Sequence, residues 1–440
     1  MSTIFQTAAR RFEVYSPEAR TSFAFELSAG ADKNRITEVL NKVARLNPML
    51  TASLCFGKDA EAYIKPASFE LPQIIFGDYK TLGQALEFEL STRKESFLTG
   101  TGALSCFYVF AGNDRLTFLI TAHTLVADET ALAEVASEII GFLNGAEEPP
   151  EEPLQLHSFG DREDIPKSAQ PLKLNLKVAA SLNKRWSKKP VEFNEAELSG
   201  VFSEYCEGRS LGVLYFETEP KLYERLKREC KLRSVPAYAA VLAALCLKNK
   251  DYCGKGDKNY NYVNYRSDLR ESAQFGEACS AANLSGELLV SCRALEALTL
   301  MQNAANCYIS AQRRIALGSA PWQNMLTSCE LNGRIIDALH IYLQRGGKSK
   351  TLKNYASISG RKFTRMLGFS AVERKLKPEG EYTLIGAAVV PAAVMTEEKT
   401  VGVFDTGKSL TVYMRYNENL LSPDKARELM SSAEALMGSI

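Results

Sequence analysis

Residues that could carry acid–base chemistry at neutral pH are scarce in this sequence, because only three of its 440 residues are histidine. His123 ends an apolar stretch and stands five residues before Asp128, in the run Ala-His-Thr-Leu-Val-Ala-Asp-Glu. Imidazole suits proton transfer at neutral pH, although a histidine at a strand end can equally be a buried structural residue. Of the other two, His157 lies just past an acidic, proline-rich stretch and His340 lies in an apolar stretch with helical spacing. The segment around His123 is therefore the first candidate for chemistry.

The elements expected around His123 are a β-hairpin and a helix. Apolar runs at 103–111 and 116–122 flank Gly112-Asn113-Asp114, which predicts a hairpin whose second strand ends at His123. After a loop to Asp128, apolar residues at helical spacing predict a helix that closes at Gly145. An earlier helix from Lys33 stops at Asn47-Pro48, before a strand at 50–56. His123 and Asp128 are thus expected at a strand-to-helix crossover.

The chain length exceeds the size at which one hydrophobic core usually stops growing. The acidic, proline-rich stretch 145–153 marks a boundary, so we expect an N-terminal lobe at 1–150, a linker at 151–200 and a C-terminal lobe at 201–440. The second half repeats the alternation of helices and strands. Its expected strands lie at 211–216, 260–265, 383–395, 401–404 and 410–416, and its helices include 294–315. The predicted class is α/β with two lobes.

Composition excludes several classes of protein. A net charge of +1 provides no global field for nucleic acid or an anionic membrane. No apolar run reaches membrane-spanning length, and charged residues interrupt the N-terminus before a signal peptide could form. The ten cysteines include no C-x-x-C pair, and Cys55, Cys106, Cys246, Cys279 and Cys292 stand in apolar or small-residue stretches. We expect a cytoplasmic protein with reduced core thiols and no zinc or other metal site.

Two apparent motifs and one basic cluster are better explained by ordinary structure than by catalysis or ligand binding. Gly346-Gly347-Lys348-Ser349 resembles the end of a phosphate-binding loop, but Tyr342 stands where that loop needs a glycine. Phe404-Asp405-Thr406-Gly407 occurs once, whereas an aspartic protease needs two facing carboxylates; a hairpin turn is the better prediction. The basic residues between Arg345 and Arg365 are expected to be solvated surface, with a phosphate-binding patch as the alternative.

The crossover resembles the acyltransferase superfamily that includes chloramphenicol acetyltransferase, condensation domains of peptide synthetases and polyketide-associated acyltransferases. Their shared signature is His-His-x-x-x-Asp-Gly. Other segments are similar to the same family, and together they span nearly the full chain. These segments are Val39 to Leu54 with Asn47-Pro48-Met49-Leu50, Val263 to Arg270, Ala356 to Arg361 as a Ser-Asn-x-Gly-like crossover strand, and the closing hairpin Val401 to Tyr416.

The resemblance implies a V-shaped pair of chloramphenicol acetyltransferase-like lobes, with a tunnel that acyl donor and acceptor enter from opposite ends. The second histidine of the signature acts as general base, and the motif aspartate pairs with an arginine. That arginine aligns with Arg266 here. The implied reaction moves an acyl group from a CoA or carrier-protein thioester to a hydroxyl or amine, with no tightly bound cofactor. A carrier protein and a small-molecule substrate are the implied partners.

This chain departs from the signature at the base. With Asp128 on the motif aspartate, His123 takes the first histidine, Thr124 the catalytic one and Glu129 the glycine. A threonine hydroxyl cannot accept a proton at neutral pH. Three interpretations stay open: His123 acts as base after a bulge or register shift, the tunnel supports chemistry without a histidine base such as a cyclisation, or the protein is a catalytically silent homologue that binds a ligand or partner.

Four further residues are candidates for the tunnel by the same resemblance. They are Cys279 and Ser280, in the segment 276–284, and Ser357 and Ser359, in the expected crossover strand. Cys279 could act as a nucleophile only beside a base or a positive charge, and a buried structural thiol is the alternative.

Overall fold

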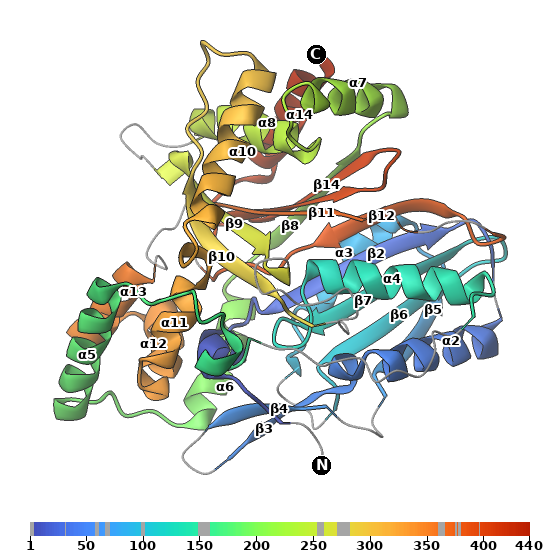
Figure 1. Ribbon diagram of the computed structural model, residues 1–440. Coiled ribbons are helices and arrows are strands. Elements are labelled where there is room, and N and C mark those ends of the chain that lie inside the picture. Colours follow the sequence, from blue (N-terminus) through green and yellow to red (C-terminus); the bar gives the residue numbers. More distant parts are fainter. Residues whose placement is uncertain are drawn as a thin grey trace.

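The computed structural model describes most of the chain (Figure 1). The described residues are 4–30, 32–57, 61–66, 71–97, 102–147, 159–252, 259–270, 282–359, 366–374, 376, 380–395 and 397–440. Helices and strands form two sheet-based lobes and a helical cluster at their side. The predicted α/β class with two lobes is confirmed.

The N-terminal lobe is built on a five-stranded sheet in the order β12-β2-β7-β6-β5. Its strands are β2 (Arg20–Leu27), β5 (Gln73–Asp78), β6 (Ser105–Ala111), β7 (Leu116–His123) and β12 (Leu384–Val390). The β6–β7 hairpin confirms the prediction, and helices α2 (Lys33–Leu46) and α4 (Glu129–Leu143) form where apolar spacing indicated them. Because successive side chains alternate along β7, Phe118 and Ile120 join the core with α2 and α4, while Leu119 packs towards α3 (Leu82–Thr92).

The C-terminal lobe has a six-stranded sheet in the order β10-β9-β11-β13-β14-β8. Its strands are β8 (Leu211–Glu217), β9 (Tyr262–Asp268), β10 (Ser285–Ser291), β11 (Leu367–Glu373), β13 (Lys399–Asp405) and β14 (Leu410–Asn417). A core shared with α7 (Pro220–Lys231), α8 (Tyr238–Tyr252), α10 (Leu300–Ala316) and α14 (Pro423–Gly438) covers this sheet, and these helices lie at the top of Figure 1. Between β11 and β13 the chain crosses over to supply β12 to the other sheet, which joins the two lobes.

A helical cluster lies beside both lobes, on the left of Figure 1. It contains α1 (Arg11–Val14), α5 (Lys173–Lys188), α11 (Gln323–Cys329), α12 (Gly333–Arg345) and α13 (Lys350–Ile358). The predicted linker 151–200 thus includes α5 and the start of α6 (Glu195–Glu207). A small sheet of β1 (Phe5–Gln6), β4 (Ala62–Lys65) and β3 (Ser53–Phe56), and short 3-10 helices at Ala8–Arg10, Pro48–Thr51, Arg162–Asp164, Asn259–Asn261 and Ala320–Trp322, complete the described elements.

The segment from Ala356 is not the crossover strand that the resemblance implied. Ser357 lies within α13, which continues to Ile358, and the strand that crosses between the lobes is β12. The physical reason is local: Ser349 caps the helix by accepting the N–H of Leu352, and apolar residues at helical spacing bury one face of α13 against α5 and α12. Ser349 therefore starts a helix and does not close a phosphate-binding loop.

The Asp405-Thr406-Gly407 segment forms the predicted turn between β13 and β14, where the Thr406 N–H donates to the Ser409 carbonyl. Among the described residues, no helix combines the length and the apolar character needed to cross a membrane.

Candidate functional site

The crossover after β7 has the predicted strand-to-helix geometry. β7 ends at His123, and the buried Asp128 begins α4 by accepting the backbone N–H of Ala131 at 2.8 Å. The other carboxylate oxygen accepts the N–H of Leu284 at 2.7 Å, from the segment that leads into β10. Asp128 therefore caps a helix of one lobe and anchors a strand of the other.

The arginine that pairs with Asp128 is Arg270, and the predicted pairing with Arg266 is wrong. Arg270 Nη2 lies 3.0 Å from Asp128 Oδ1, and Nη1 lies 3.2 Å from Oδ2, which is a bidentate contact. Arg270 follows the end of β9, whereas Arg266 lies inside that strand. The two arginines are four residues apart, which corresponds to about 13 Å along an extended chain. They therefore reach different partners. The resemblance located the right segment but not the right residue.

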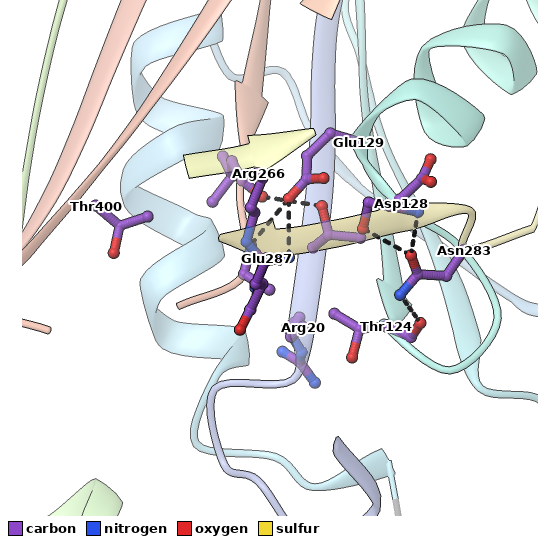
Figure 2. A network of polar contacts seen from close by, with 12 residues as sticks. Arg20, Thr124, Asp128, Glu129, Arg266, Asn283, Glu287 and Thr400 are labelled. Carbon is purple, nitrogen blue, oxygen red and sulfur yellow. Dashed lines mark hydrogen bonds and ion pairs between the residues drawn. The ribbon is translucent and has the colours of Figure 1, made fainter. Parts of the chain in front are cut away.

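Arg266 instead forms the centre of a separate network between the lobes, drawn in Figure 2. Its guanidinium contacts Glu287 at 2.5 Å and Glu129 at 3.5 Å. Glu129, which stands where the family has glycine, also accepts the N–H of Ala392 at 3.3 Å, and burial raises its pKa. No pattern in the sequence around Glu129 indicates this role. Its carboxylate now joins α4, β9 and the segment after β12.

A second buried carboxylate, Glu397, lies close enough to interact electrostatically with Arg266 and Glu287. It accepts hydrogen bonds from Asn264 Nδ2 at 2.7 Å and Thr400 Oγ1 at 2.9 Å. Burial raises the pKa of Glu397 to about 7. Glu397 is therefore a structural residue whose carboxylate has hydrogen-bond donors from two side chains. Its raised pKa means that it titrates near neutral pH.

Thr124 occupies the position of the family base and has no partner for its hydroxyl. The residue is 2% exposed, and its Oγ1 lacks a hydrogen bond to any described residue. Its backbone is held firmly, because its N–H donates to Ala19 at 3.0 Å and its carbonyl accepts from Asn283 Nδ2. An alcohol cannot take up a proton at neutral pH. The side chain at position 124 therefore presents no general base.

His123 keeps the regular strand register and lines a cavity that Thr124 does not line. β7 pairs with β2 residue for residue up to Arg20 and His123, so the bulge that would turn its side chain is not there. His123 Nδ1 accepts the N–H of Leu125 at 3.2 Å, which puts the ring proton on Nε2. Burial, with a smaller contribution from Arg20, lowers the pKa of His123 to about 3. At neutral pH this imidazole is uncharged and offers a donor.

A cavity of about 290 Å³ opens at the His123 side chain, between the N-terminal lobe and α6. Arg20 lies beside His123 at its wall, and aromatic rings supply much of the remaining surface. Thr124 does not line this cavity. The lining residues are Tyr15, Ser16, Pro17, Ala19, Arg20, Phe56, Arg93, Glu95, Ser96, Phe97, His123, Glu195, Leu198, Ser199, Phe202 and Ser203.

Arg20 is a buried arginine whose hydrogen bonds all go to uncharged acceptors. It donates to the carbonyl and hydroxyl of Thr92 and to the Glu95 carbonyl, and its guanidinium lies 4.4 Å from the centre of the Phe97 ring. The nearby Arg93 lies 2.8 Å from Glu89 and is therefore already paired. Burial and then the charge of Arg93 lower the pKa of Arg20. Among the described residues, this guanidinium at the cavity wall donates only to uncharged acceptors, while the carboxylate of Glu89 lies close enough to act on it electrostatically.

The remaining predicted site residues do not meet at the crossover. Ser357 is exposed on α13, and Ser359 donates to the Tyr355 carbonyl at the end of that helix. Cys279 and Ser280 lie outside the described residues, as does His157. His340 is buried on α12, with its ring centre 4.3 Å from that of Phe12. None of the described residues in this group shares the cavity at His123.

Three cysteines meet although their spacing in the sequence is irregular. The Sγ atoms of Cys246, Cys292 and Cys307 all lie within 4.8 Å of one another in the C-terminal lobe. The sequence analysis predicted the first two as separate core thiols and expected no metal site, because no pair had ligand spacing. No local signal connects these positions, since only the packing of α8, β10 and α10 brings them together.

Comparisons with known proteins identify the fold. No family model and no curated protein matches the sequence. Among solved structures, the first condensation domain of the CDA synthetase is 12% identical, with a TM-score of 0.61, 99% of this chain covered and 96% of that chain. The epimerization domain from the third module of tyrocidine synthetase B is 15% identical, with a TM-score of 0.62 and coverage of 100% and 96%. Polyketide synthase associated protein 5 from Mycobacterium tuberculosis is 12% identical, with a TM-score of 0.58 and coverage of 99% and 96%. The chain has the fold of these condensation and epimerization domains, which confirms the resemblance at the level of the fold.

Proposed function

We propose that this protein binds a small molecule that carries an anionic group, in the cavity at His123, and that it does not transfer acyl groups through a histidine base. The observation that carries the proposal is the state of the crossover. Thr124 has replaced the base, and His123 is held as a neutral donor. Loss of a general base typically costs a factor of about 10² to 10⁴ in rate.

The ligand's charge follows from Arg20. The hydrogen bonds of this buried cation go to neutral acceptors, and the nearby Glu89 carboxylate is already paired with Arg93, so a ligand carboxylate would give Arg20 a counter-ion of its own. The donor that His123 offers through Nε2–H adds a second contact for the same group. Arg20 and His123 are direct neighbours across the β2–β7 pair. An anionic head at this end of the cavity therefore meets two donors together.

The body of the ligand follows from the aromatic lining. Tyr15, Phe56, Phe97 and Phe202 surround the space that Arg20 and His123 close. Small-molecule sites are commonly apolar with a few placed polar groups, and rings pack well against flat or aliphatic bodies. We therefore propose an aryl or alkyl carboxylate of modest size as the ligand class.

Acyl transfer from a CoA or carrier-protein thioester is the competing function, because the fold matches condensation domains over nearly the whole chain. In that function the thioester would be a co-substrate and a carrier protein a partner. The two proposals predict different outcomes. The first predicts that the protein binds a free carboxylate, and the second predicts that it transfers the acyl group of a thioester to an acceptor.

Calorimetric titration with 3-phenylpropionate and with its uncharged amide tests the proposal. We expect the carboxylate to bind more tightly than the amide, because only the carboxylate pairs with Arg20. Ser199→Trp, at an exposed position of α6 that lines the cavity, should abolish binding. Ser431→Trp, at an exposed position of α14, is the matched control and should bind as the wild type does.

The same preparations are then incubated with octanoyl-CoA and an amine acceptor, and the products are separated by chromatography. We expect no turnover by the wild type. Multiple turnovers that disappear in His123→Asn would overturn the proposal and establish acyl transfer with His123 as base. Equal affinity for acid and amide would instead refute the role of Arg20.

A further inference from the structure

Three thiols from distant parts of the sequence meet in the core of the C-terminal lobe. Cys246 lies on α8, Cys292 directly follows β10, and Cys307 lies on α10. They are 4%, 1% and 1% exposed, and their sulfur atoms are all within 4.8 Å of one another. We propose that these three cysteines form a zinc-binding site that stabilises this lobe, independent of the cavity at His123.

The spacing of the sulfur atoms suits zinc. A Zn–S bond of about 2.3 Å and tetrahedral angles place the sulfurs of bound thiolates roughly 3.8 Å apart. The observed limit of 4.8 Å leaves only small side-chain movements to reach that separation. The backbone also holds one ligand in place, because the Cys292 N–H donates to the Asn261 carbonyl at 2.8 Å.

Zinc binding by this cluster is coupled to loss of the thiol protons, because the thiolate is the form of cysteine that binds a metal ion. Binding then releases the three thiol protons as three Zn–S bonds form, and the product carries one negative charge. Copper(I) on the same three thiolates would carry two. Because burying charge is costly in an apolar core, a divalent thiophilic ion fits better than a monovalent one.

Asn249 supplies a second observation, one helical turn along α8 from Cys246. It stands three residues after Cys246, on the same side of α8, and it is 1% exposed. Its Oδ1 has no hydrogen-bond partner among the described residues. A buried carbonyl oxygen without a donor is costly, and a cation beside it removes that cost. We assign Asn249 Oδ1 as the fourth ligand of a tetrahedral ion.

The test measures metal content in the full-length protein, produced in medium supplemented with zinc and purified without chelators. Since the thiols are buried, the ion is expected to enter as the lobe folds, so metal is supplied during production. Elemental mass spectrometry should find about one zinc per chain. A preparation from cobalt-supplemented medium should show thiolate-to-cobalt charge-transfer absorption and the visible bands of tetrahedral cobalt.

Variants separate a metal site from ordinary core packing. Cys292→Ser and Cys307→Ser should lose the metal and the cobalt spectrum. Cys230→Ser is the matched control, because Cys230 is a similarly buried thiol in the same core, on α7, and it should keep both. Asn249→Ala should retain sulfur–cobalt absorption but change the visible bands. If a variant does not fold, the wild-type metal content and spectrum still decide the question.

A wild-type protein that contains no zinc and takes up no cobalt overturns the proposal. So does a Cys230→Ser variant that loses metal to the same extent as Cys292→Ser, since binding would then not depend on the cluster. Detection of a disulfide between two of the three cysteines in freshly purified protein would also overturn it.

Discussion

The pKa of His123 makes the unfolding free energy of this protein depend on pH in a way that can be isolated. Burial lowers the pKa from 6.5 to about 3, so the folded protein keeps this imidazole neutral while the unfolded chain protonates it. The unfolded state binds the extra proton, and stability from this residue is therefore present above pH 6.5 and is lost as the pH falls. Between pH 7 and pH 5 the loss is about 2 kcal/mol, and it hardly depends on the folded pKa while that lies well below 5.

His123→Asn isolates this contribution. The asparagine Oδ1 can accept the Leu125 N–H as Nδ1 does, but it does not titrate. Urea unfolding of both proteins at several pH values between 7 and 5 gives two curves. We expect the unfolding free energy of the wild type to fall by about 2 kcal/mol relative to that of the variant across this range. Other titrating groups are common to both proteins, so their contributions cancel in the difference.

The control is Thr121→Val, a substitution two residues earlier that lies on the same side of β7 and carries no titratable group. Its difference from the wild type should be constant with pH. A constant difference for His123→Asn as well would show that His123 titrates normally in the folded protein. The main argument against a histidine base at this crossover would then be lost.

Three further predictions concern the polar network. In double-mutant cycles measured by urea unfolding, the stability effects of Asp128→Asn and Arg270→Met should deviate from additivity by about 0.5 to 3 kcal/mol. The deviation for Asp128→Asn with Arg266→Met should be much smaller, and equal deviations would contradict the pairing of Asp128 with Arg270. Thr124→Val should leave the unfolding free energy unchanged or raise it by up to about 1 kcal/mol, because the hydroxyl is buried without a partner, and a clear loss would reveal one. Glu397, with its pKa raised to about 7, binds a proton more readily when folded, so its contribution is lost as pH rises. From pH 5 to 8 the wild type should lose about 2.5 kcal/mol relative to Glu397→Gln, and parallel stability curves would refute the raised pKa.

Local patterns predicted the elements that hold the site better than they predicted its contacts. The β6–β7 hairpin and the helix after Asp128 depend on turn residues and apolar spacing, and both are found. The expected strand at Ala356 is wrong, because Ser349 caps a helix there and the apolar spacing that follows is helical. The position at which β9 ends determines whether Arg266 or Arg270 contacts Asp128. This position depends on how the two lobes pack together, which local sequence patterns do not report.

The changes at the crossover are physically connected. A glycine at position 129 would leave Arg266 with Glu287 as its ion-pair partner, whereas the glutamate extends from α4 to Arg266 and to the backbone after β12. A charged side chain in this buried place is stable only because partners from the other lobe neutralise and hydrogen-bond it. Thr124 lies five residues before Glu129, and its hydroxyl takes no part in these contacts. Of the residues that differ from the signature, Glu129 therefore joins the lobes, and neither it nor Thr124 lines the cavity at His123.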